Sequence, residues 1–106
     1  MRKANVFYQD LWAGTISENE EGYQFAYNEN YLNSLNANAI SLTLPLRKEA
    51  YESKVLFPFF DGLIPEGWLL DIAVTNWKLD PKDRFGLLLT MCRDCIGAVS
   101  VIPNED

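Results

Sequence analysis

The stretch ANVFYQDLWAGTIS, residues 4–17, contains two short β-prone runs that meet near Gln9 and Asp10. Two such runs joined by a short polar turn are typical of a β-hairpin. The sequence GYQFAYN follows at residues 22–28, and its aromatic residues alternate with smaller or polar ones. Alternation with a period of two indicates a strand with one buried face. The beginning of the chain therefore predicts an antiparallel sheet made of a hairpin and a third strand.

The region after this third strand predicts one more strand and then a connector. Leucine and isoleucine alternate with serine and threonine in AISLTLPL, residues 39–46, which is again the pattern of a strand. Pro45 has no N–H group to donate to a neighbouring strand, so the strand is expected to end there or to lie at a sheet edge. The next residues, RKEAYESKV at 47–55, are rich in charge and are predicted to form a connector.

The second half of the chain predicts helices and a closing strand. Proline is favoured in the first turn of a helix, where its missing N–H group would have no partner. Pro58 therefore predicts a short helix, and Pro65 predicts a longer one that runs to about Lys78. A third helix is expected after Asp80 as its N-cap, and the β-branched run that follows predicts a strand over residues 95–102.

Together these elements predict a single domain over residues 1–106 of the α+β class. We expect an antiparallel sheet, partly barrel-like, packed with two to three helices and completed by a C-terminal strand. A chain of 106 residues is near the commonest size of one domain.

The composition limits the classes of function and the setting. A net charge of −6 argues against direct nucleic-acid binding, because phosphate contacts need a Lys/Arg-rich surface. Because no apolar run approaches about 18 residues, we expect no membrane span. The first residues lack the apolar core of a signal peptide, and the chain has only two cysteines. We therefore expect a reduced, cytoplasmic protein.

The side chains needed for catalysis are scarce. The chain has no histidine, which excludes Ser-His-Asp, Cys-His and histidine-based metal sites. It also lacks a glycine-rich nucleotide-binding motif, so we expect no enzyme, no cofactor and no metal. The motif CRDC, with Cys92 and Cys95, leaves a small redox protein as an alternative from another class. The cysteines are expected at a helix C-terminus, however, where the dipole does not lower a thiol pKa.

The predicted helix from Pro65 to Lys78 has more apolar surface than one core contact needs. At about 100° per residue, its apolar residues cover about 240° of the helix, whereas a single core face needs little more than about 100°. Trp77 falls within this arc and is expected in the core. Trp68 lies at the rim of the arc near the helix start. We therefore expect Trp68 on a partner surface, where tryptophan is strongly enriched.

Two motifs of the second half resemble a known family. FFDGLIPEGW at 59–68 and RFGLLLTMCRDCIGAVSVIP at 84–103 are similar to the N-terminal subdomain of the HipA-like serine/threonine kinase toxins. That subdomain carries a Phe-Phe-Asp-x-Leu-x-Pro segment, then a Phe-x-Leu-Leu helix and an Arg-Asp-x-x-Gly-Ala-Val strand. The first half agrees more loosely, and Cys92 stands where relatives more often have glycine. The family's ATP-binding and catalytic residues lie in the kinase body beyond this subdomain, so none is carried over.

A free-standing copy of this subdomain resembles HipS, the antitoxin of tripartite HipBST toxin–antitoxin systems. The resemblance implies a HipT-like kinase toxin that is bound and inhibited in trans, and a HipB-like DNA-binding protein as a further partner in a ternary complex. We expect segment 59–69 to dock at or near the kinase active-site cleft, with Trp68 as anchor. The residues expected to contact the kinase are Trp68, Phe59, Asp61, Ile64, Glu66, Gly67 and Leu69. A regulatory or folding subunit that assists the kinase without direct inhibition is the alternative within the binding class.

Overall fold

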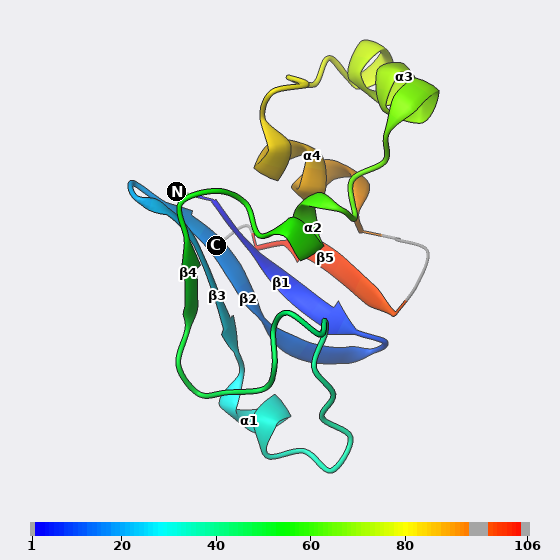
Figure 1. Ribbon diagram of the computed structural model, residues 1–106. Helices are drawn as coiled ribbons and strands as arrows, with labels where there is room; N and C mark the ends of the chain where they lie inside the picture. The colour runs from blue at the N-terminus through cyan, green and yellow to red at the C-terminus, as the bar shows by residue number, and fades with distance from the viewer. Residues whose placement is uncertain (1, 94–97, 105–106) are drawn as a thin grey trace.

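The computed structural model describes residues 2–93 and 98–104, and of Trp68 it describes the backbone only. Five strands form one antiparallel sheet in the order β4-β3-β2-β1-β5 (Figure 1). The strands are β1 (Lys3–Tyr8), β2 (Leu11–Asn19), β3 (Gly22–Tyr27), β4 (Tyr51–Ser53) and β5 (Val99–Pro103). The predicted α+β class, with its antiparallel sheet and C-terminal strand, is confirmed.

The hairpin predicted from residues 4–17 is present. Tyr8 pairs with Leu11, and Gln9 occupies the turn with a φ of 55°. The predicted third strand is β3, which pairs with β2, while β5 closes the other side of the sheet by pairing with β1. Residues 95–97 of the predicted closing strand lie outside the described residues.

The described residues also form four helices: α1 (Glu29–Leu32), α2 (Pro58–Asp61), α3 (Gly67–Trp77) and α4 (Arg84–Met91). The core lies between one face of the sheet and helices α2 and α4. Phe25 of β3 packs against Phe60 of α2 with ring centroids 5.5 Å apart, and Phe85 of α4 is fully buried beside them. Helix α3 lies farther from the sheet than α4 does (Figure 1).

The prediction of a strand over residues 39–46 is wrong. In this segment only an isolated bridge joins Ser41 to Leu44, and Leu42 is 99% exposed. The cause is the buried hydroxyl of Tyr27, which accepts a hydrogen bond from the Ile40 N–H at 3.1 Å and donates one to the Leu44 carbonyl. Held at these two points, the chain turns between them, so Ile40 and Leu44 are buried while Leu42 points outward.

The predicted charged connector contains β4, which the sequence did not indicate. Residues Tyr51–Ser53 pair with β3 through their backbone, and at the sheet edge such pairing does not require apolar side chains. The Arg47 guanidinium lies over the Tyr51 ring, 3.7 Å from its centroid, so this charged residue packs against the strand.

Two predicted helix starts are displaced. Helix α3 begins at Gly67 instead of Pro65, with Glu66 as its N-cap, and α4 begins at Arg84 with Asp83 as its N-cap. Asp83 accepts a hydrogen bond from the Gly86 N–H at 3.1 Å. Asp80, the predicted cap, instead accepts one from the Lys82 N–H at 2.9 Å and forms a turn before the helix.

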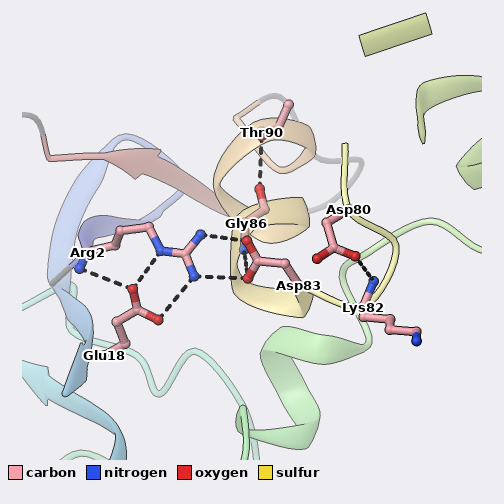
Figure 2. Close-up of polar contacts among 7 residues, drawn as sticks. All are labelled: Arg2, Glu18, Asp80, Lys82, Asp83, Gly86 and Thr90. Carbon is pink, nitrogen blue, oxygen red and sulfur yellow. Dashed lines mark hydrogen bonds and ion pairs between the residues drawn. The ribbon is translucent and has the colours of Figure 1, made fainter. Parts of the chain in front are cut away.

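Arg2 connects the sheet to the start of α4 (Figure 2). Its guanidinium donates hydrogen bonds to Glu18 of β2 at 2.6 Å and to Asp83 at 2.7 Å. It also lies 5.4 Å from the centroid of the Phe85 ring. Because Asp83 also caps α4, this ion-pair network fixes the helix relative to the sheet.

Candidate partner-binding surface

The segment 59–69 is attached to the core by its apolar residues. Phe60 and Ile64 are buried, and the partly buried Phe59 ring lies edge-on to Phe60 with centroids 5.2 Å apart. Ile64 is therefore a core residue that supports the segment from beneath. This packing anchors α2 in the core, and the residues that follow leave the core from there.

Asp61 lies in an ion pair at the end of α2. Its carboxylate accepts a hydrogen bond from Arg84 Nε at 2.6 Å, and both side chains are partly exposed. The Asp61 carboxylate raises the pKa of the Arg84 guanidinium through this hydrogen bond. The pair links α2 to the start of α4, which gives Asp61 a structural role beside any contact with a partner.

The chain enters α3 through an exposed turn. Glu66 is extended at the N-cap, and Gly67 has a φ of 64°, a left-handed conformation that favours glycine. Apart from its neighbours along the chain, nothing lies within 4 Å of the position a Cβ would occupy at Gly67, so backbone conformation is the reason for glycine here. The backbone of Trp68 lies in the first helical turn, and its side chain lies outside what the structure describes.

Helix α3 exposes large apolar side chains on a solvent-facing surface. Leu69 is 48% exposed, Ile72 is 46% exposed and Trp77 is 59% exposed. The prediction that Trp77 belongs to the core is therefore wrong. Among the α3 side chains that the structure describes, the domain covers a stripe formed by Leu70, Ala73 and Val74. Leu69, Ile72 and Trp77 of the wide apolar arc are left at the surface.

The predicted contact residues thus differ in exposure: Ile64 is buried, and the side chain of Trp68 is not described. Glu66, Gly67 and Leu69 are exposed and lie close together at the start of α3, whereas Phe59 and Asp61 are half-buried. Ile72 and Trp77 extend the exposed group along α3. In the sequence, the excess width of the apolar arc was the pattern that indicated surplus apolar surface at Ile72 and Trp77.

Two further expectations from the sequence concern metal-binding side chains and the cysteine pair of the CRDC motif. Residues 2–93 and 98–104 contain no cluster of metal-binding side chains. Cys92 is buried at the C-terminal end of α4, and its sulfur lies 3.4 Å from the Leu63 carbonyl oxygen. Cys95 lies outside the described residues. Among the helices described, none has the length and apolar character of a membrane span.

Comparison with known proteins points to one family. A family model described as the HipA N-terminal domain matches residues 4–102. A solved structure entitled "N-terminal domain of HipA toxin" superposes with a TM-score of 0.78 at 30% identity, covering 100% of this chain and 95% of that one. A Shewanella oneidensis MR-1 complex of HipA, HipB and operator DNA contains a chain that superposes with a TM-score of 0.72. At 19% identity, with 97% of this chain and 24% of that one covered, this likeness shows the fold alone.

Curated relatives occur in two sizes. An uncharacterized protein of Haemophilus influenzae is 32% identical over 101 residues, which cover 95% of this chain and 92% of that protein. The Sinorhizobium fredii protein described as "Putative kinase Y4mE" is 29% identical over 106 residues. That match covers 99% of this chain but only 25% of Y4mE. The same domain is therefore found in a protein of similar length and as about a quarter of a much longer one.

Proposed function

Because the chain belongs to the HipA N-terminal domain family, we propose that it is a non-catalytic antitoxin that binds and inhibits a HipA/HipT-like serine/threonine kinase in trans. One observation carries this proposal. The domain exposes Leu69, Ile72 and Trp77 on one helix, and in Y4mE a domain like it accompanies three times its length of further chain. A domain separated from such a neighbour leaves the surface that packed on it uncovered, and such a surface is expected to be apolar.

The contact is proposed to centre on segment 59–69 at or near the kinase active-site cleft. Phe60 and Ile64 are buried, Glu66 and Gly67 are exposed, and the backbone of Trp68 follows at once in the first turn of α3. A large aromatic anchor on a fixed turn binds with little loss of conformational entropy. Occupation of the cleft would block entry of nucleotide or substrate, or stabilise an inactive conformation of the kinase.

Any association with DNA is proposed to run through a HipB-like partner. With a net charge of −6, the chain itself is poorly suited to phosphate contacts. The ternary complex of small protein, kinase and HipB-like protein would bring it to DNA without a basic surface of its own.

The test is the Trp68→Ala variant, titrated against a purified HipT-like kinase by isothermal calorimetry. Loss of a central aromatic anchor is expected to weaken binding by about 2 kcal/mol or more, roughly 30-fold in Kd. Co-expression should show the same loss as a return of kinase-dependent growth arrest. Trp12→Ala is the matched control, because Trp12 is 49% exposed on β2, in the sheet.

A folded Trp68→Ala variant that neutralises the kinase with unchanged affinity would contradict the proposed anchor. If the wild-type chain binds no HipT-like kinase, the antitoxin proposal itself fails. Binding that leaves phosphorylation by the kinase unchanged would favour the regulatory or folding subunit instead.

A further inference from the structure

An apolar groove runs between α3 and the end of α4. We call it the α3–α4 groove: it has a volume of about 480 Å³, and its walls include Leu69, Ile72 and Trp77 of α3 and Thr90 and Met91 of α4. Arg93 lies at its edge, just beyond α4. The volume is in the range of about 300–1,000 Å³ that is typical of binding pockets. Trp77 and Ile72 are largely exposed although they line a concave surface, so the groove is shaped to receive apolar groups from outside.

We propose that this groove receives an apolar segment of the kinase body that carries a carboxylate group beside its apolar side chains. The inference rests on the proposed function and adds a second contact, in which the kinase inserts into the small protein. At the other contact, Trp68 of the small protein would insert into the kinase.

Continuity with segment 59–69, the proposed kinase contact, is the reason to choose the kinase as the occupant. Pro65 and Leu69 belong to that segment and also line the groove, so a partner seated on the Glu66–Gly67 turn would cover both. One partner that spans the two features would bury the exposed part of α3 in a single contact. The sparse packing of α3 on its own domain supports this, since among its described side chains the covered apolar ones are Leu70, Ala73 and Val74.

The positive charge of Arg93 at the edge of the groove is the reason to expect a carboxylate on the kinase segment. Arg93 is exposed and makes no ion pair with any residue in the described ranges, in a chain with only nine basic residues. Arginine binds carboxylates in a planar, two-point geometry. A carboxylate next to the inserted apolar group would therefore meet Arg93 at the edge of the groove.

Fluorine NMR can observe both contacts at once. The chain has three tryptophans, so labelling with 5-fluorotryptophan gives three resonances, which Trp→Phe variants assign. Addition of an unlabelled HipT-like kinase is expected to shift or broaden the resonances of Trp68 and Trp77 and to leave that of Trp12 unchanged. A shift at Trp68 alone would overturn the groove contact and leave the proposed function standing. If none of the three resonances responds and calorimetry shows no binding, the proposed function fails as well.

A second copy of this chain is the competing occupant of the groove. It would shift the Trp77 resonance as protein concentration rises in the absence of kinase, and that result would overturn the proposal. The carboxylate is tested by Arg93→Glu, which is expected to weaken kinase binding about fivefold, the size of one ion pair at an interface edge. Lys48→Glu makes the same charge change at an exposed position outside the groove and serves as the control. Equal affinity of the two variants would contradict the role of Arg93.

Discussion

Tyr27 determines the path of the chain after β3 through a single hydroxyl group. The ring is buried and stacks against Tyr31, and the hydroxyl bonds to the backbone of both Ile40 and Leu44. Burial raises the pKa of Tyr27 to about 12, so the hydroxyl stays protonated and able to donate over the whole physiological range.

Replacing Tyr27 with phenylalanine should therefore destabilise the domain by about 2 kcal/mol. The variant keeps the ring but leaves the buried N–H of Ile40 and carbonyl of Leu44 without their partner, and each such group carries a desolvation penalty of about 1–3 kcal/mol. Urea unfolding measures the change. Tyr51→Phe is the matched control, because the Tyr51 hydroxyl donates to the Pro45 carbonyl at an exposed site, where water can replace it. Equal losses in the two variants would contradict the role given to burial.

At the residue scale, the ion pairs of Arg2 make a pH-dependent contribution to the stability of the fold. Its hydrogen bonds lower the pKa of both Glu18 and Asp83, so these carboxylates are more easily ionised in the folded chain than in the unfolded one. Groups of this kind stabilise the fold fully above their unfolded pKa of about 4, and the contribution disappears as the pH falls through the lower folded pKa.

The Arg2→Ala variant should consequently lose about 1 kcal/mol of unfolding free energy at pH 7, a modest value because all three side chains are partly exposed. The difference from wild type should shrink as the pH is lowered from 5 toward 3. Urea titrations across this range measure it, with Lys3→Ala as a neighbouring charge deletion outside the network. A difference that stays constant with pH would show that the packing of Arg2 on Phe85, and not its ion pairs, is what matters.

At the scale of elements, local sequence patterns predicted the strands and helices whose formation depends mainly on neighbouring residues. The hairpin, β3 and the short helix at Pro58 followed from alternation and from turn or cap residues, and all are present. The segment at 39–46 has the same alternation but is held by the distant hydroxyl of Tyr27, which no local pattern reveals. Strand β4 depends on backbone pairing at a sheet edge and so leaves little trace in side-chain polarity.

The exposed surface of α3 was predictable only in part, because it also depends on tertiary packing that local patterns do not reveal. The width of the apolar arc on α3 indicated surplus apolar surface, but a helical projection does not say which stripe the domain covers. The tertiary packing of α3 decides this, so Trp77 was placed in the core and is in fact exposed. The cap of α4 was misplaced similarly, because Asp83 is selected over Asp80 by its additional ion pair with Arg2.

Helix α3 ends in a conformation that its C-cap residue disfavours. Lys78 has φ 53° and ψ 45°, the left-handed region in which a residue with a Cβ is strained by about 1 kcal/mol or more. Lys78→Gly should therefore stabilise α3 by about 0.5 kcal/mol, after allowance for the greater freedom of glycine in the unfolded chain. Native-state hydrogen exchange of the α3 amides measures this. Thr75→Gly, inside the helix, should act in the opposite direction by about 0.3 kcal/mol. Faster exchange in Lys78→Gly would contradict the assignment of strain.

For the whole molecule, the domain has a well-packed body and one helix that is only partly used by that body. The sheet, α2 and α4 share a continuous core, whereas α3 contributes few residues to it and exposes Leu69, Ile72 and Trp77. Local stability is expected to follow the same division, because segments with few buried apolar contacts open most easily. A partner that covers α3 would therefore change the stability of this region most.

The antitoxin proposal thus predicts how kinase binding affects the whole chain. A ligand that binds only the folded state stabilises it by about 2.7 kcal/mol when its free concentration is 100 times Kd. We expect a HipT-like kinase at that excess to slow hydrogen exchange throughout this chain, with the largest protection in residues 67–77. The Trp68→Ala variant at the same kinase concentration should show much less protection, because its Kd is raised. Protection centred on the edge strand β4 instead of α3 would show that the kinase docks elsewhere, by strand addition, and would contradict the surface described above.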